Sequence, residues 1–128
     1  MAMKKKGQKR TPEVKVKESD GLVEVTIKFH CDKNGGHNHV IVEDIDDKHV
    51  SVGLTTKKKK GKNHPNYPLD QSPLGDGKES YMRRQGTVAP KKEYMSPRKG
   101  KMTKDDYAQA KVYADRAKEK YKKEQQKK

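Results

Sequence analysis

Apolar and polar residues alternate over much of the first half of the chain, as in β-strands with one buried face. The clearest run lies within residues 22–30, and its apolar positions are Val23, Val25, Ile27 and Phe29. A turn composition at 18–21 and a shorter alternation at 14–16 precede this run. Residues 14–29 therefore predict a β-hairpin.

A second hairpin is predicted from residues 39–54. Residues 39–42 are mostly apolar, and 50–54 alternate again. Residues 46–48 between them have the composition of a tight turn. Gly53 lies inside the second strand, which indicates a bulge or a close approach of backbone. A further short strand is predicted at 86–88.

The C-terminal region has the period of a helix. Thr103 is the expected N-cap, with Asp106 at the third helical position. The stripe that follows, at spacings of three and four, comprises Tyr107, Ala110, Ala114, Ala117 and Tyr121. This stripe predicts a helix packed on the strands, and a dimer or partner seam is the alternative.

The pattern as a whole predicts one domain of the α+β class, mainly β. Few short strands usually close into a small barrel. We expect a flexible basic arm at 1–12 and a barrel at 13–95, with a long basic loop at 57–79. A linker and the C-terminal helix follow at 96–121, and a basic tail occupies 122–128.

The net charge of the chain indicates what kind of molecule it binds. The 128 residues include 32 Lys and Arg against 18 Asp and Glu, a net charge of +14, and only 28% are hydrophobic. Such a positive field attracts phosphate backbones, which favours nucleic acid as the partner, whereas a solubilising coat of lysines is the simpler alternative.

Other features of the sequence bear on where the protein acts. No apolar run approaches the ~20 residues of a membrane span, and residues 1–10 lack the apolar stretch of a signal peptide. The single cysteine, Cys31, cannot form an internal disulfide, which fits a reducing compartment. We therefore expect a cytoplasmic protein that does not bind membranes.

Three groups of residues could carry chemistry on a phosphodiester. Thr55 and Thr56 could hold a phosphate together with the lysines that follow them, or could simply end a strand. Arg83 and Arg84 could stabilise a developing oxyanion, but neighbouring strand residues face opposite ways, so only one can share a site with the threonines. The third group consists of His37 and His39, which could act as base and acid, or could be loop histidines without a role.

Metal and cofactor chemistry is not expected. His30, Cys31, His37 and His39 have no common zinc spacing. The nucleic-acid contacts would come from the basic loop and from aromatic rings near it, which could stack on bases or simply pack in the barrel. These candidates are Lys57, Lys58, Lys59, Lys60, Lys62, Tyr67, Lys78 and Tyr81.

The order of several motifs over residues 35–121 resembles the MazF/PemK-like toxins. Residues 35–42 resemble the strand that follows the Gly-rich first loop of that family, and residues 50–56 resemble its next strand, which ends in a Thr/Ser motif. Residues 80–88, followed by Lys91, resemble its late strand. The related ToxN-like toxins are a similarly loose match.

This resemblance implies an SH3-like barrel that dimerises and cleaves single-stranded RNA without a metal, with a small acidic antitoxin as a partner. It thus favours RNA over DNA, and Thr55 or Thr56 would take the threonine/serine position of the family. Asn38 stands where the family has an arginine. That departure favours the main alternative, a non-catalytic DNA- or RNA-binding accessory protein of a plasmid or mobile element.

Overall fold

The computed structural model of the protein describes residues 21–32, 35–58 and 65–126. Within these residues, six strands precede one long helix. The strands are β1 (Leu22–Asp32), β2 (Gly35–Ile45), β3 (Lys48–Thr55), β4 (Tyr67–Pro68), β5 (Tyr81–Pro90) and β6 (Tyr94–Thr103). A short 3₁₀ helix, η2 (Lys91–Glu93), joins β5 to β6, and α1 (Lys104–Gln126) follows directly after β6.

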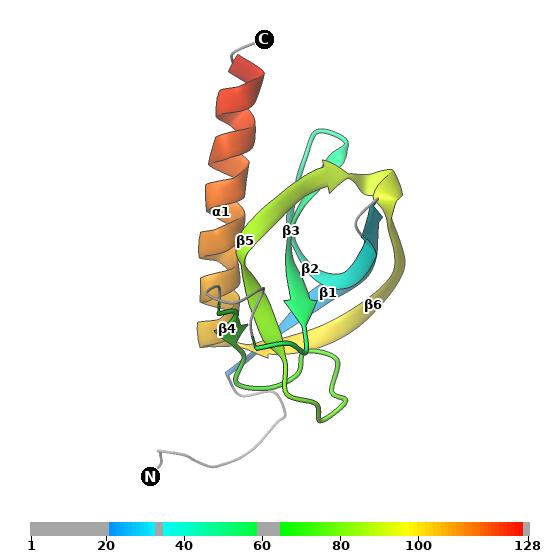
Figure 1. Ribbon diagram of the computed structural model, residues 1–128, viewed down its shortest axis with the longest axis vertical. Coiled ribbons are helices and arrows are strands. Elements are labelled where there is room, and N and C mark those ends of the chain that lie inside the picture. Colours follow the sequence, from blue (N-terminus) through cyan, green and yellow to red (C-terminus); the bar gives the residue numbers. More distant parts are fainter. Residues whose placement is uncertain (1–20, 33–34, 59–64, 127–128) are drawn as a thin grey trace.

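All strands belong to one antiparallel sheet in the order β4-β5-β3-β2-β1-β6. The sheet curls strongly, and α1 runs along one side of it (Figure 1). The mainly-β α+β class is therefore confirmed. The sheet is not closed into a barrel, because β4 and β6 form its two edges and do not pair with each other.

The central strand β3 shows why the sheet has two different faces. Its apolar residues Val50, Val52 and Leu54 alternate with His49, Ser51, Gly53 and Thr55, and all seven are buried. Successive side chains of a strand point to opposite faces. The face that carries the valines is called the apolar face below, and the one that carries His49 and Ser51 is called the polar face.

The helix covers the apolar face. Ala110, Tyr113 and Ala114 are buried there with the strand valines. Gly86 on β5 allows this close approach, since a Cβ atom at that position would lie 2.7 Å from the Tyr113 carbonyl oxygen. Small residues on both elements therefore set the distance between helix and sheet.

The first turn of α1 is tied to two other segments. The amide of Asp106 donates to the Thr103 hydroxyl, so the predicted N-cap is confirmed. The carboxylate of Asp106 accepts from the Asp70 amide at 2.8 Å, and Thr103 donates to the Asp70 carboxylate at 2.9 Å. These bonds fix the helix start against β6 and the segment after β4.

Several sequence predictions are corrected by these bounds. The linker was expected to begin at residue 96, but residues 96–103 lie within β6, and the strand expected at 86–88 extends over Tyr81–Pro90. The helix continues to Gln126, so residues 122–126 are not a separate tail. The first arm of the predicted hairpin at 14–16 and the arm at 1–12 lie outside the described residues.

The second predicted hairpin, formed by β2 and β3, is confirmed. Its turn lies at residues 46–47, and Asp46 there has a positive φ of 56°. Within the described ranges, no helix is both long enough and apolar enough to cross a membrane.

Candidate active site on the polar face of the sheet

Five buried side chains from four strands form a polar cluster on the polar face. This histidine cluster comprises His30, His39, His49, Ser51 and Tyr94. None of the five is more than 7% exposed. Because buried polar groups are costly without partners, each of these groups needs hydrogen bonds.

Ser51 links two members of the cluster. Its hydroxyl lies 3.0 Å from Nδ1 of His39 and 2.8 Å from the phenol oxygen of Tyr94. A serine hydroxyl donates one hydrogen bond and also accepts, so it can serve His39 in either ring tautomer, with Tyr94 filling the other role. The imidazole of His39 is therefore held in place whether or not Nδ1 carries a proton.

Tyr94 is the centre of the cluster. The rings of His30 and His49 lie 4.6 and 4.8 Å from the Tyr94 ring, centre to centre, and the ring of His39 lies at 6.1 Å. Burial raises the pKa of Tyr94, although the bond with Ser51 opposes this and the nearby Glu93 charge adds to it. The phenol therefore stays neutral over a wider pH range than a free tyrosine.

His30 and His49 each pair with a carboxylate. Nε2 of His30 lies 2.9 Å from Glu93, and Nδ1 of His49 lies 2.6 Å from Asp44. Desolvation acts to raise the pKa of Asp44, but hydrogen bonds from His49 and Lys91 hold it below its ordinary value. Asp44 is therefore an anion at neutral pH, and it fixes the orientation of His49.

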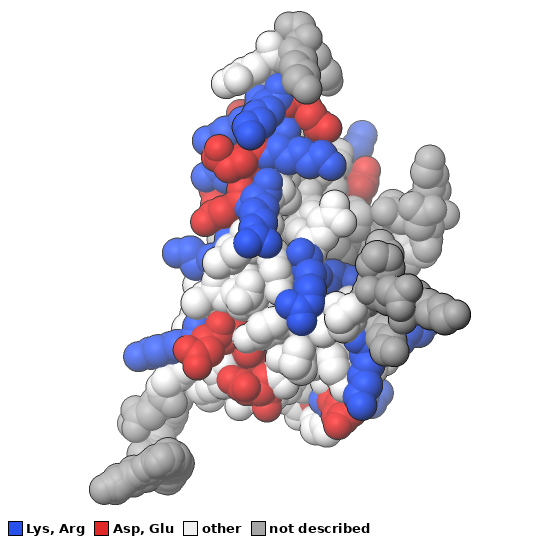
Figure 2. Space-filling view, turned by 60° about the vertical axis from the view of Figure 1, so that its left-hand side comes forward, with Lys and Arg blue, Asp and Glu red and all other residues white. Residues whose placement is uncertain are grey.

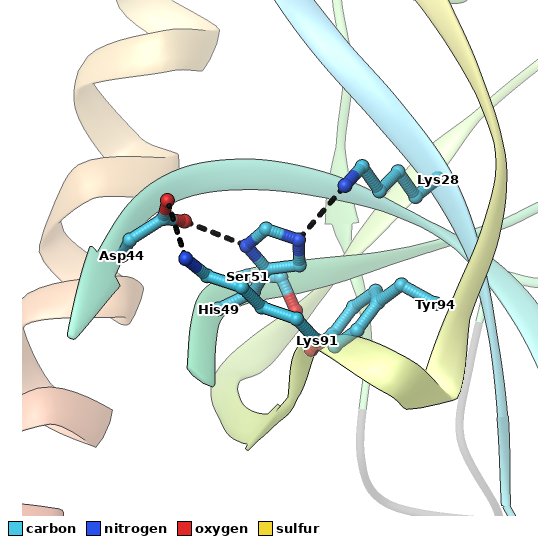
Figure 3. A network of polar contacts seen from close by, with 6 residues as sticks. All are labelled: Lys28, Asp44, His49, Ser51, Lys91 and Tyr94. Atoms are coloured by element: carbon cyan, nitrogen blue, oxygen red, sulfur yellow. Dashed lines mark hydrogen bonds and ion pairs between the residues drawn. The ribbon is translucent and has the colours of Figure 1, made fainter. Parts of the chain in front are cut away.

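The other nitrogen of His49 contacts a lysine. Nζ of Lys28 lies 2.9 Å from Nε2 of His49, on the side of the ring away from Asp44 (Figure 3). Nζ of Lys91 lies 3.3 Å from the second oxygen of Asp44. The network therefore joins β1, β2, β3 and η2 on one face of the sheet.

A bulge brings Arg83 to the same face. Val52 pairs with Gly86 and Leu54 pairs with Met82, so residues 83–85 of β5 lie opposite Gly53 alone. A Cβ atom at Gly53 would lie 3.3 Å from both Cγ of Arg83 and Nε2 of His39. The missing side chain thus leaves room for the Arg83 stem and the His39 ring on either side of Gly53. Of the two alternatives predicted at Gly53, the bulge is confirmed by the register shift between β3 and β5.

Arg84 points the other way. Its guanidinium donates to the Pro65 carbonyl at 3.0 Å and to the Tyr113 hydroxyl at 3.2 Å, and it lies over the Tyr67 ring. These contacts join β4 to the helix on the apolar face. The two arginines therefore point to opposite faces of the sheet, and Arg83 lies on the face that carries Thr55.

The basic loop begins beside the same part of β3. The buried hydroxyl of Thr55 accepts from the Lys57 amide at 3.1 Å. Asn66 holds the other end of the loop. Its side chain donates to the Lys57 carbonyl at 3.0 Å, and its backbone amide donates to the Lys58 carbonyl at 2.7 Å. Thr56 is exposed just after the strand. Lys59, Lys60 and Lys62 lie outside the described residues.

The remaining predicted residues differ in exposure and in what they contact. His37 is exposed on β2, two residues before His39 and therefore on the same face. Tyr81 pairs with Thr55 and is buried, with its hydroxyl 3.3 Å from Glu79. Tyr67 packs against Tyr113 on the helix side, and Lys78 is exposed in the loop before β5. Tyr67 and Tyr81 therefore both make packing contacts in this structure.

Sequence reasoning missed most of the histidine cluster. In β3 the cluster could have been found from the residues between the apolar ones, which are His49, Ser51, Gly53 and Thr55. These residues are small or polar, so a search for alternating apolar residues does not identify them as buried. His30 and Tyr94 meet through the β1–β6 ladder, in which they are direct partners. That pairing joins residues far apart in the sequence and has no local signal. Within the described ranges, no three His, Cys, Asp or Glu side chains are arranged to hold a metal ion.

Charge is distributed unevenly over the molecule. On the face that carries the helix, basic and acidic side chains are interspersed (Figure 2). Residues 1–20, 33–34, 59–64 and 127–128 contain thirteen of the 32 Lys and Arg residues but three of the 18 Asp and Glu residues. Most of the positive net charge therefore comes from these segments, one of which is the basic loop that starts beside Thr55.

Known proteins give no further guide to this site. No protein-family model matches the chain, and no curated protein or solved structure matches it. The resemblance to the MazF/PemK-like toxins therefore rests on the sequence motifs alone.

Proposed function

We propose that this protein binds single-stranded RNA and cleaves it without a metal ion at the polar face. The observation that carries the proposal is that the stem of Arg83, at Cγ, and Nε2 of His39 both lie next to Gly53, with Nδ1 of His39 held by buried Ser51. Phosphodiester cleavage by acid–base chemistry needs an oriented acid or base, and the guanidinium at the end of the Arg83 stem would stabilise the developing negative charge.

The two histidines of β2 supply a base and an acid. Residues two apart on a strand are about 6.6 Å apart on one face, so His37 and His39 could lie on either side of a phosphate. Nε2 of one histidine would take the proton of the ribose 2′-hydroxyl, whose oxygen attacks the adjacent phosphorus. The other histidine would give a proton to the departing 5′-oxygen. The products are a 2′,3′-cyclic phosphate and a free 5′-hydroxyl, and Arg83 would stabilise the charge of the transition state.

Binding would depend on the basic loop. Lys57 and Lys58 are exposed next to Thr55, and the same loop continues through Lys59, Lys60 and Lys62. Contacts to phosphate do not read the sequence of the RNA, and they weaken as salt rises.

The MazF/PemK-like resemblance extends the proposal to the whole molecule. The strongly curled sheet, and the bond from the Lys101 amide on β6 to the Pro73 carbonyl in the segment after β4, support a partly open barrel of the SH3-like kind. A toxin of this type would act in the cytoplasm, form a homodimer and bind a small acidic antitoxin.

A second candidate function is supported by burial. His39 is only 7% exposed, and its Nδ1 is occupied by Ser51. Such a histidine is also a good structural member of a polar core. The protein would then be a non-catalytic DNA- or RNA-binding accessory protein.

The test is cleavage of a long single-stranded RNA in EDTA by the full chain and by three variants. His39→Ala and Arg83→Met should abolish cleavage, whereas Arg84→Met removes the same charge from the opposite face and should leave the rate of the folded protein unchanged. RNA that stays intact but is retarded on a gel would exclude cleavage and favour the binding protein. Equal loss in both arginine variants would contradict the assignment of Arg83.

A further inference from the structure

The contact between Lys28 and His49 has consequences for the charge that each residue carries. Nδ1 of His49 lies 2.6 Å from the Asp44 carboxylate, so this nitrogen carries the proton of the neutral ring and donates it. Nε2 is then an acceptor, and the ammonium of Lys28 donates to it at 2.9 Å. Lys28 has no lone pair when charged, so this arrangement requires a neutral His49.

Protonation of His49 removes that acceptor. Both ring nitrogens would then be donors, and Nε2–H would face the Lys28 ammonium at hydrogen-bond distance. Two like charges at this separation repel each other strongly in a partly buried site. Asp44 would stay with Nδ1, so Lys28 is the group that must leave.

The released lysine remains on the polar face. Lys28 on β1 is the direct ladder partner of His39 on β2, so both side chains lie on the same face. The flexible stem of a lysine allows its ammonium to move while its backbone stays in the ladder. Away from His49, the Lys28 ammonium can therefore reach the surroundings of His39.

We propose that His49 controls Lys28 through its protonation state, and that the released Lys28 is an additional phosphate-binding cation of the RNA site. This inference rests on the proposed function for its ligand, although the exchange between Lys28 and His49 can be measured without RNA.

The charged and titratable groups around His49 show which of them would respond to a change in its charge. Lys28 faces it from β1, Asp44 from β2 and Tyr94 from β6, whereas Lys91 of η2 reaches it only through Asp44. Asp44 is an anion and Tyr94 is neutral around neutral pH. Of the two basic residues, only Lys28 contacts the ring directly, so its position depends most on the charge of His49.

The first experiment follows the His49 ring nitrogens and the Lys28 ammonium by NMR in the full chain without RNA. The Lys28→Met variant keeps most of the side-chain length but removes the charge. The proposal predicts that His49 becomes protonated at a higher pH in this variant, and that the Lys28 ammonium signal of the wild type changes as His49 titrates. Identical His49 titrations in wild type and Lys28→Met would overturn it.

The second experiment measures affinity for a 2′-O-methyl RNA oligonucleotide, which cannot be cleaved, at about pH 7.5 and about pH 5.5. The wild type should bind roughly tenfold more tightly at the lower pH, and Lys28→Met should lose most of that gain. The control Lys57→Met should bind more weakly at both pH values and keep the gain. An unchanged gain in Lys28→Met would overturn the role of Lys28.

The two experiments separate this inference from the function on which it rests. If the oligonucleotide does not bind at either pH, RNA binding and the phosphate-binding role of Lys28 both fail. The NMR titration then still decides whether His49 controls Lys28.

Discussion

Nδ1 of His39 lies 3.0 Å from the hydroxyl of Ser51, and both side chains are buried in the polar face of the sheet. This contact orients His39, whose Nε2 lies next to Gly53 together with the stem of Arg83. The account of function depends on that orientation, because an acid or base must be held within reach of the atom it serves.

Replacement of Ser51 by alanine should therefore disturb the site more than its surroundings. Ser51→Ala leaves Nδ1 of His39 and the Tyr94 hydroxyl without their shared partner, which should cost about 1–3 kcal/mol of stability in urea unfolding. Cleavage by the folded variant should fall at least about tenfold. Tyr94→Phe is the matched control, because it keeps the bond between Ser51 and His39 and should retain most of the activity. Equal activity in Ser51→Ala and the wild type would contradict the positioning role.

Two glycines allow site geometry and fold stability to be tested separately. In Gly53→Ala the new methyl group lies 3.3 Å from both His39 and Arg83, so these side chains must move by a few tenths of an ångström. We expect a roughly tenfold loss of cleavage with little change in stability.

In Gly86→Ala the methyl group meets the Tyr113 carbonyl oxygen at 2.7 Å, so the helix must shift. We expect a loss of about 1–3 kcal/mol of stability with near-normal activity of the folded fraction. Unfolding curves and single-turnover rates for both variants check this, and the reverse pattern would contradict it.

Tyr94 should contribute to the stability of the protein at alkaline pH. Because its pKa is raised by folding, its contribution is complete below the ordinary value of about 10 and is lost as pH rises through the folded value. Stability of the wild type should thus fall more steeply above about pH 10 than that of Tyr94→Phe. Urea unfolding at several alkaline pH values measures the two slopes. Parallel curves would show that Tyr94 is not the group responsible.

Asp106 should make the helix start sensitive to pH. Burial raises its pKa, the amide of Asp70 opposes this, and one of its carboxylate oxygens has no hydrogen-bond partner among the described residues. The contribution of this raised group is complete below the ordinary value of about 3.9 and is lost as pH rises through the folded value. Asp106→Asn should therefore gain stability relative to the wild type between about pH 3 and about pH 6. Asp105→Asn is the control, because it removes one negative charge from the same turn of the helix. A similar gain in stability in Asp105→Asn would argue against the burial of Asp106 as the cause.

The sequence predicted the elements whose pattern is local. The alternation of residues 23–29, the β2–β3 hairpin and the Thr103 cap all depend on neighbouring residues, and each appears in the structure. Strand β6 was missed because it is an edge strand whose residues 95–99 are exposed, so its sequence carries no apolar alternation.

The candidate site could be predicted only in part, for the same physical reason. His39 and Arg83 were identified by residue type, and the alternation rule separated Arg83 from Arg84 without showing which one lies on the polar face. The hydrogen bonds that orient His39 come from Ser51 and, through it, from Tyr94 on the far edge strand. Such contacts depend on how the sheet curls, which no local pattern specifies.

The most direct measurement is to map RNA contacts by NMR, with the full chain and an uncleavable 2′-O-methyl RNA. The account predicts that the largest chemical-shift changes occur on the polar face, at Gly53, Thr55 and the side chains of His39 and Arg83. These changes should weaken together as salt rises. Changes confined to the helix face, around Arg84 and Tyr113, would contradict the account and place the nucleic-acid site on the opposite side of the sheet.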